Sequence, residues 1–372
     1  MLTQSLVISN IEIYKLTVQL KEPFITSLGK EEYAENIIVL IRTSNGHTGF
    51  GECNPFMPIN GENAETCIVV GKLLANMLKK KNAMDIEDCN QCMDRLIYGN
   101  NSIKSAFDIA LHDLTAQHYG LPLYKLLGGK INRELVTDYT VSLDEPGKMA
   151  DDALKIKEAG FPAIKIKLGQ DVATDIDRIK AIRKAVGKKI PLRLDANQGW
   201  SVKEAIEVLG ALKNDDIQFC EEPIPRWNFM NLKKVKKESP IPIMADECCC
   251  DHHDVKRLIE LEACDKMNFK VGKSGGLHNA QKMLKLAEKA GIDVQIGAFM
   301  ESRLAMTAFA HLALSSHTVK YCDFDTPLMH AEDHVTGGIT YHENGMIKVP
   351  DEPGLGAKYE EDFLNRFEKT VI

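Results

Sequence analysis

The pattern of hydrophobic and polar positions changes near residue 125. Before this point, an alternating segment at 7–20 and an apolar run at 37–42 predict two strands. Segments at 64–80 and 102–118 carry apolar residues at helical spacing and predict two helices. Strands followed by helices indicate a compact α+β domain over residues 1–125.

From residue 126 onwards, short apolar runs alternate with helical segments, as expected for a parallel sheet. The runs end every 24 to 28 residues, which suits a repeated βα unit. Eight such runs predict an α/β fold, a modified TIM barrel of (β/α)7β form, over 126–325. We expect the tail, 326–372, to return to the first domain and complete it. The predicted strands are 137–141, 163–168, 191–194, 217–220, 241–245, 266–270, 293–297 and 320–324.

Composition narrows the class of protein. Hydrophobic residues make up 44% of the chain and charged residues 27%, which is typical of a soluble globular protein. No apolar run approaches the ~20 residues that cross a bilayer, and the N-terminus lacks the pattern of a signal peptide. Ten cysteines in 372 residues do not make a disulfide scaffold, so we expect a cytoplasmic protein. The net charge of −7 argues against a nucleic-acid-binding face.

Three carboxylates follow three consecutive predicted strands. Asp195, Glu221 and Asp246 each stand where an apolar run ends, and Asn197 and Glu247 lie close by in sequence. The carboxyl ends of barrel strands meet on one face, where barrel enzymes place their sites. Each acid alone could instead cap the following helix. Three acids at matched positions predict a site for one Mg²⁺ per subunit, with Asn197 and Glu247 as supporting residues.

Lysines end two other predicted strands. Lys165 and Lys167 are two residues apart and share a strand face, where each is expected to lower the pKa of the other. Such a lysine can act as a base near neutral pH. Lys270 ends an apolar run four strands away, across the barrel. Lysines on opposite sides of the barrel suit removal of a proton from one face of a substrate and return of a proton to the other face. Lys273 follows and either supports the site or belongs to the loop.

Two more acids, Asp323 and Asp325, close the last predicted strand. They could bind a second cation or a substrate ammonium group, or they could cap the turn that follows.

This set of residues resembles the enolase superfamily, and within it the muconate-lactonizing subgroup. The Lys-x-Lys pair, the Asp/Glu/Asp set and the lysine of the sixth strand carry the resemblance. It extends over nearly the whole chain through further motifs: Gly51-Glu52, Leu121-Pro122-Leu123, Leu127-Gly128-Gly129 and Pro353-Gly354-Leu355-Gly356.

The Asp323-Phe324-Asp325 motif resembles that of the dipeptide epimerases. The resemblance implies that Asp323 and Asp325 hold the α-ammonium of a dipeptide, while Lys167 and Lys270 exchange the α-proton of its C-terminal residue through an enediolate. It further implies that Lys165 contacts the substrate carboxylate, and that Thr140, Ala298 and Met300 contact the substrate. The implied reaction converts L-Ala-D-Glu to L-Ala-L-Glu in murein peptide metabolism, in a homo-oligomeric enzyme.

One position departs from this resemblance. Members acting on L-Ala-Glu can carry an arginine in the first-domain loop, where this chain has Gly29, followed by Lys30 as a possible substitute. Epimerisation of hydrophobic or cationic dipeptides therefore stays open, as do muconate cycloisomerisation, o-succinylbenzoate synthesis and N-acylamino acid racemisation. A carboxylate-binding barrel without catalysis is the non-enzymatic alternative.

Two cysteine motifs are set aside. Cys89 and Cys92 lack a second pair at zinc spacing, and the run Cys248-Cys249-Cys250 is interpreted as small residues packing a loop.

Overall fold

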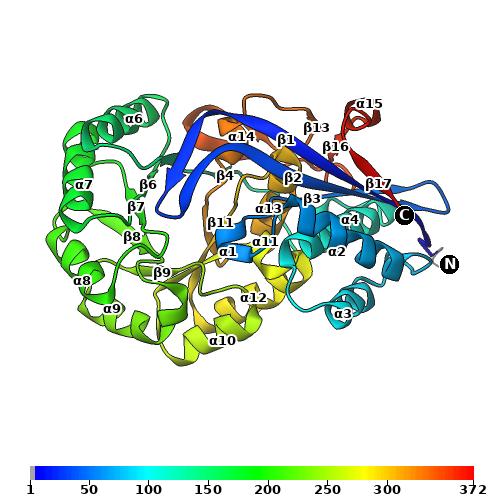
Figure 1. Ribbon diagram of the computed structural model, residues 1–372, viewed down its shortest axis with the longest axis horizontal. Coiled ribbons are helices and arrows are strands. Elements are labelled where there is room, and N and C mark those ends of the chain that lie inside the picture. Colours follow the sequence, from blue (N-terminus) through cyan, green and yellow to red (C-terminus); the bar gives the residue numbers. More distant parts are fainter. Residues whose placement is uncertain (1–4) are drawn as a thin grey trace.

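The structure is a computed structural model that describes residues 5–372, so the first four residues of the predicted domain 1–125 lie outside the described residues. An N-terminal antiparallel sheet with its helices lies beside a ring of alternating strands and helices (Figure 1). The hairpin of β1 (Ile8–Thr26) and β2 (Gly29–Thr43) reaches from this sheet over the barrel (Figure 1).

The antiparallel sheet has the strand order β17-β1-β2-β3, with β3 at Thr48–Cys53 and β17 at Lys369–Val371. Both predicted strands are present, and β1 continues to Thr26 after an irregular stretch between Gln19 and Phe24. Pro23 interrupts the alternating pattern there, which is why the sequence predicted a shorter strand.

Helices cover this sheet, and the two longest agree with the predicted segments. The helix α4 packs so closely on β3 that a Cβ on Gly51 would lie 1.8 Å from the carbonyl oxygen of Ala106. Only glycine allows this approach of helix to strand. The helices are α1 (Met57–Asn60), α2 (Ala64–Leu78), α3 (Ile86–Leu96), α4 (Asn101–His118) and α5 (Leu123–Leu126).

Eight parallel strands form the barrel in sequence order from β5 to β12. A parallel bridge between Thr137 and Cys322 joins the segment before β5 to β12 and closes the ring. The predicted (β/α)7β barrel is confirmed, because a helix or helical segment follows each strand from β5 to β11. The strands are β5 (Tyr139–Val141), β6 (Ile164–Lys167), β7 (Leu192–Asp195), β8 (Ile217–Glu221), β9 (Ile243–Ala245), β10 (Lys266–Lys270), β11 (Asp293–Gly297) and β12 (Val319–Cys322). The connecting helices are α6 (Pro146–Glu158), α7 (Val172–Val186), α8 (Val202–Ala211), η1 (Arg226–Asn231), α9 (Leu232–Glu238), α10 (His252–Glu260), α11 (Val271–Ser274), α12 (Leu277–Ala290) and α13 (Arg303–Leu314).

The tail contacts both parts of the chain. β15 pairs with β4 (Leu135–Val136) just before the barrel, and β17 pairs with β1 of the first sheet. The boundaries at 125 and 325 stay a prediction. The tail elements are α14 (Thr326–Met329), β13 (Val335–Gly337), β14 (Thr340–Tyr341), η2 (Glu343–Gly345), β15 (Met346–Lys348), β16 (Ala357–Tyr359), α15 (Glu361–Leu364) and β17.

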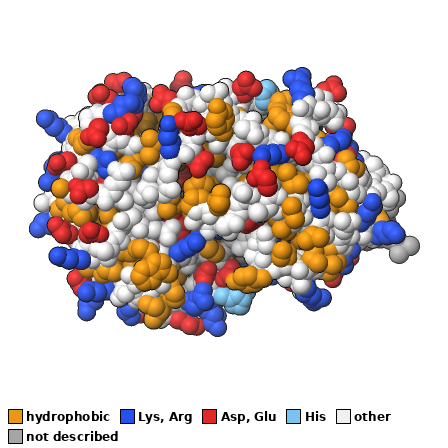
Figure 2. All heavy atoms as spheres, in the orientation of Figure 1, with side chains coloured by type: hydrophobic (Ala, Val, Ile, Leu, Met, Phe, Trp, Pro, Cys, Tyr) orange, Lys and Arg blue, Asp and Glu red, His pale blue; other side chains and the backbone are white. Residues whose placement is uncertain are grey.

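The exterior carries both signs of charge. On the face shown in Figure 2, acidic and basic side chains are intermingled and do not gather by sign. Among residues 5–372, no helix has the length and apolar character of a membrane span.

Candidate active site

The charged strand ends of the barrel converge on one buried cluster. Parallel register places Lys165 beside Thr140 and places Lys167 beside Asp195, which in turn lies beside Glu221. Asp246 follows β9, and Lys270 ends β10. The sequence therefore predicted correctly that these residues meet, because strands of one barrel end on one face.

Ion pairs hold this cluster together. The Lys165 Nζ lies 2.7 Å from Asp323 Oδ2, 3.0 Å from Glu221 Oε2 and 3.1 Å from Asp195 Oδ2. The Lys167 Nζ lies 2.6 Å from Asp195 Oδ2. Ion pairing stabilises these buried charges, because a buried ammonium or carboxylate without a partner would be costly.

A second group of ion pairs centres on Asp246. The Lys270 Nζ lies 2.9 Å from Asp246 Oδ2, and Lys273 pairs with Asp246 Oδ1. Lys273 also donates to the backbone carbonyl of Asp246 and does not line the cavity described below. Lys273 thus contacts the cluster from beneath, while Lys270 faces the open space above it.

The lysine pKa values differ from the prediction. Burial lowers the pKa of Lys165, but Asp323, Glu221 and Asp195 outweigh it and hold the pKa well above its ordinary value. Burial likewise lowers the pKa of Lys270, and Asp246 reverses the effect, so this pKa is also raised. The sequence showed lysine beside lysine and could not show that each ammonium has a carboxylate closer to it.

The carboxylates Asp195, Glu221 and Asp246 are the candidate ligands of a metal ion. Within residues 5–372 no three acidic, His or Cys side chains are arranged around a common point, since Lys165 stands between Asp195 and Glu221. The donor set nevertheless suits a hard cation, because it consists of carboxylate oxygens from adjacent strands. Burial and Asp195 raise the pKa of Glu221 to about 8, a cost that a divalent cation would remove.

Two buried amides hold Glu221 from below. Asn268 donates to Glu221 Oε1 at 2.8 Å, and Gln295 donates to Glu221 Oε2 at 3.2 Å. The sequence reasoning missed both residues. The alternation of side chains along a strand could have identified Asn268. It lies two residues before Lys270 on the same strand and so shares its face.

The predicted supporting residues Asn197 and Glu247 contact each other. Asn197 donates to Glu247 Oε1 at 3.1 Å, and Asn197 also lines the cavity. The Oε2 atom of Glu247 is buried without a hydrogen-bond partner in residues 5–372. An unpartnered carboxylate oxygen beside this cluster agrees with a cation there.

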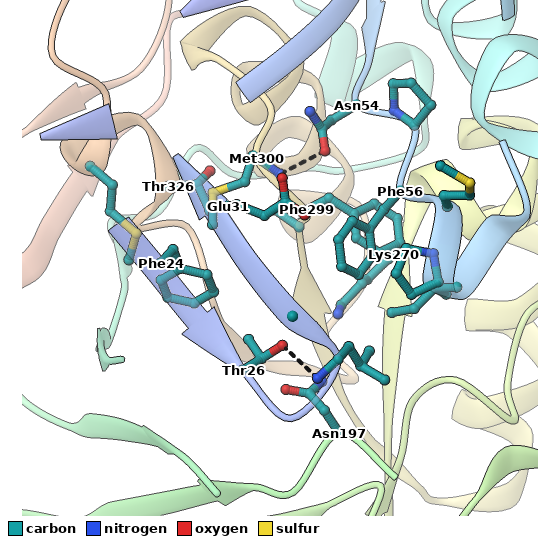
Figure 3. A pocket seen from close by; sticks show the side chains of 18 of the residues that line it. Phe24, Thr26, Glu31, Asn54, Phe56, Asn197, Lys270, Phe299, Met300 and Thr326 are labelled. Carbon is teal, nitrogen blue, oxygen red and sulfur yellow. Dashed lines mark hydrogen bonds between the residues drawn. The ribbon is translucent and has the colours of Figure 1, made fainter. Parts of the chain in front are cut away.

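Above the cluster lies a cavity of about 540 Å³ between the barrel and the β1–β2 hairpin. Phe24 lies on one side, and Phe56 and Phe299 lie on the other (Figure 3). The charged residues Lys165, Lys167 and Lys270 line its floor together with Asp323 and Asp325. The other predicted contacts that line it are Thr140, Ala298 and Met300.

Asp325 does not cap the helix that follows it. Asp325 precedes α14 without a side-chain cap bond, and its Oδ2 accepts from the backbone N–H of Thr140 at 2.7 Å. Both Asp323 and Asp325 lie beyond the end of β12, so the last strand ends earlier than the sequence predicted. Burial and the neighbouring Asp323 raise the pKa of Asp325 to about 8, which indicates a place prepared for positive charge.

The prediction that Lys30 contacts the substrate is wrong, because its side chain lies outside the cavity. Lys30 pairs with Glu32 at 2.6 Å on an exposed surface and does not line the cavity. Its neighbours Gly29 and Glu31 do line the cavity, because successive residues of a strand point to opposite sides. Gly29 has a φ of +148°, a conformation that L side chains rarely adopt, so the turn itself favours glycine over arginine here.

Within residues 5–372 the cysteines of the two motifs belong to no cluster of three or more metal-ligating side chains. Cys248 donates to Glu222 at 3.3 Å and Cys250 donates to the carbonyl of Glu247 at 3.3 Å. All ten cysteines are free, as the interpretation of this run as loop packing requires.

The fold and this cluster define the class of protein. Residues 9–128 match the mandelate racemase / muconate lactonizing enzyme N-terminal domain, and residues 148–363 match the enolase C-terminal domain-like family. The chain therefore belongs to the mandelate racemase/muconate lactonizing enzyme family of the enolase superfamily, as its motifs predicted.

The similar relatives narrow this class. The chain is 52% identical to a D-Ala-D/L-Ala epimerase of Cytophaga hutchinsonii, over 99% of this chain and 100% of the relative. It is 40% identical to an L-Ala-D/L-Glu epimerase of Clostridium acetobutylicum, over 94% of this chain and 98% of the relative. The solved dipeptide epimerase of Cytophaga hutchinsonii, complexed with Mg and D-Ala-L-Val, superposes with a TM-score of 0.97 at 52% identity, covering 98% of this chain and 100% of that one.

Proposed function

We propose that this chain is a Mg²⁺-dependent dipeptide epimerase that inverts the α-carbon of the C-terminal residue. The observation that carries the proposal is the placement of Lys167 and Lys270. They line one cavity from β6 and β10, which stand four strands apart in an eight-stranded ring. Two bases on opposite sides of a substrate can remove the α-proton from one face and return a proton to the other, which inverts the α-carbon.

Asp195, Glu221 and Asp246 are the proposed cation-holding residues. A divalent cation held there would supply a counter-charge for the negative charge that builds up on the substrate carboxylate when the α-proton leaves. Lys165 is placed to contact the same carboxylate, because it lines the cavity beside Asp195 and Glu221.

The two bases must differ in charge at the start of each turnover. A neutral lysine removes the α-proton from one face, and a protonated lysine delivers a proton to the other. Lys167 and Lys270 are now paired with Asp195 and Asp246. An Asp246 carboxylate that held the cation would no longer neutralise Lys270, and the pKa of Lys270 would fall.

Asp323 and Asp325 are the proposed sites for the substrate ammonium. Both are buried acids at the cavity edge, and they distinguish the proposal from cycloisomerase and synthase activities, whose substrates lack an ammonium group. Thr140 and the segment from Ala298 to Met300 line the same cavity and are the other proposed substrate contacts.

The experiment is α-proton exchange in deuterated water, monitored by NMR and mass spectrometry over a panel of dipeptides and their N-acetyl derivatives. We expect exchange and epimerisation of free dipeptides, loss of both on chelation, and recovery with Mg²⁺. Asp246→Asn should also lose the rise in melting temperature that Mg²⁺ gives the wild type.

Three outcomes would contradict the proposal. Binding without exchange would indicate a carboxylate-binding protein. Equal turnover of N-acetylated substrates would indicate an N-acylamino acid racemase. Full activity in metal-free protein would remove the role of the carboxylates.

A cytoplasmic location is part of the proposal, supported by ten free cysteines, which suit a reducing compartment. The predicted homo-oligomer stays a prediction, for which light scattering is the direct test.

A further inference from the structure

The charges of the cavity are unevenly distributed. Its only cationic side chains among the described residues are Lys165, Lys167 and Lys270, all on the floor and all paired with carboxylates. The walls above them are mainly apolar. The wall residues include Phe24, Leu28, Phe56, Met57, Phe299 and Met300.

One acid in the wall has no partner. Glu35 pairs with Lys15 at 3.3 Å, and Glu62 accepts from the backbone N–H of Ser102 at 2.9 Å. Asp323 and Asp325 are bonded as described above. The Glu31 carboxylate alone, of the five acids that line the cavity, has neither hydrogen bond nor ion pair to residues 5–372.

Glu31 faces the cavity because of strand alternation. Glu31, Tyr33 and Glu35 follow each other at every second position of β2, and all three line the cavity. Glu32 lies on the other side of the strand with Lys30. Burial and the neighbouring Glu35 raise the pKa of Glu31, so the site already disfavours negative charge.

Glu31 also lies close to the reacting positions. It is the register partner of Phe24 across the hairpin, and the Phe24 ring centre is 5.7 Å from the Lys167 Nζ. On the opposite side, the Phe299 ring centre is 5.0 Å from the Lys270 Nζ. A substrate residue whose α-carbon lay between the two lysines would have its side chain beside these aromatic rings, in the cavity that Glu31 also lines.

We propose that Glu31 is a specificity-determining residue that rejects dipeptides whose C-terminal residue carries a carboxylate side chain. The inference rests on the proposed epimerase activity and specifies its substrate class. The C-terminal residue of an accepted dipeptide has an apolar or cationic side chain. A second carboxylate would be desolvated beside an unpartnered acid and would find no free cation in the wall. The glutamyl dipeptide implied by the resemblance is accordingly not the preferred substrate.

An isosteric pair of substrates isolates the charge. L-Ala-L-Gln and L-Ala-L-Glu have side chains of nearly equal shape, and L-Ala-L-Leu serves as the apolar reference. We expect the wild type to turn over the glutamine dipeptide with a kcat/KM about tenfold or more above that of the glutamate dipeptide. This comparison needs no variant, so it holds even if a substitution disturbs folding.

The matched variants are Glu31→Gln and Glu32→Gln. Glu31→Gln should bring the two values of kcat/KM to within about threefold of each other by raising the glutamate value, since the repulsion is gone. Glu32→Gln, on the other face of the same strand, should keep the wild-type ratio. Turnover of L-Ala-L-Leu by Glu32→Gln should match that of the wild type.

Three results would overturn the inference. One is equal turnover of the glutamine and glutamate dipeptides by the wild type. Another is an unchanged ratio in Glu31→Gln. If no dipeptide of the panel exchanges its α-proton, the proposed function fails and the selectivity fails with it, whereas the first two results leave the epimerase intact.

Discussion

At the scale of single residues, each proposed base is paired with a carboxylate of the proposed cation site. Lys167 lies 2.6 Å from Asp195, and Lys270 lies 2.9 Å from Asp246. The two bases thus sit in separate ion pairs on opposite sides of the cavity floor. In the proposed mechanism each base serves one face of the substrate, so the role of each can be tested by removing the bases one at a time.

This separation predicts complementary defects. Lys167→Ala and Lys270→Ala should each slow epimerisation about 100-fold or more, because inversion needs both faces. Each variant should still exchange the α-proton of one epimer without inverting it, and the two variants should act on opposite epimers. NMR in deuterated water with each pure epimer measures both effects.

Lys30→Ala is the control for this pair, since Lys30 is exposed and lies outside the cavity. Epimerisation by either base variant at a rate near that of the wild type would show that a single base serves both faces.

At the scale of elements, a strand of the first sheet organises a barrel loop. Glu52 of β3 accepts from Ser302 N at 2.8 Å, from Ser302 Oγ at 2.6 Å and from Ala305 N at 2.9 Å, at the start of α13. Asn54 accepts from Met300 N at 3.3 Å. β3 therefore fixes the segment that carries Ala298 and Met300 into the cavity.

Glu52→Gln tests this connection. An amide has one acceptor oxygen, so some of the buried donors around Glu52 lose their partner, and the free energy of unfolding should fall by about 1–3 kcal/mol. The KM for dipeptides should rise more than kcat falls, since the loop lines the cavity and carries neither proposed base. Urea unfolding and steady-state kinetics measure the two effects, and an unchanged KM would show that the loop holds its position without β3.

The pH dependence of stability has a local source in α13. His311 is buried, accepts from Tyr124 N at 3.2 Å and binds the Leu355 carbonyl at 3.1 Å, so it joins α5 and the tail. Burial lowers the pKa of His311 to about 4. Between pH 6.5, the ordinary value, and about pH 4, the unfolded chain binds a proton that the folded chain does not.

Stability contributed by the neutral ring is therefore complete above pH 6.5 and is lost as the pH falls. The loss is about 3 kcal/mol over this interval, from about 1.4 kcal/mol for each pH unit. His311→Gln should show a correspondingly shallower decline when urea unfolding is measured across the interval. Parallel curves for the two proteins would contradict the assignment to His311.

The elements that the sequence predicted well are those with a local signal. Strands β6, β8 and β10 were placed within a residue or two because a buried apolar run ends in a charged residue at each one. The extension of β1 past Pro23 was missed, since that proline breaks the alternating pattern. The local pattern of hydrophobic and polar residues indicates which positions are buried. It does not predict an irregular stretch in the pairing of two strands.

At the scale of the whole molecule, the sequence predicted the cavity floor and, of its walls, the segment of Ala298 and Met300, but it missed the part that the first domain contributes. The floor comes from strand ends of one barrel, where topology alone brings the residues together. The walls depend on contacts between distant segments, such as the hydrogen bond from Ser27 to the carbonyl of Ala196 at 3.1 Å. No periodicity in the chain encodes that pairing, so Phe24, Glu31 and Phe56 were not predicted to meet the lysines.

The hairpin that lies over the barrel has a consequence for how such an enzyme can change. Every residue proposed to move a proton or hold the cation lies on or directly after a barrel strand, whereas Phe24 and Glu31 belong to a two-stranded ribbon. In the proposed enzyme, substitutions at a few neighbouring positions of the hairpin can therefore change the substrate preference and leave the catalytic and cation-holding residues unchanged. A gene library confined to positions 24–35 should yield variants with new substrate preferences and intact catalytic residues. Natural variation in the same short segment would have the same effect.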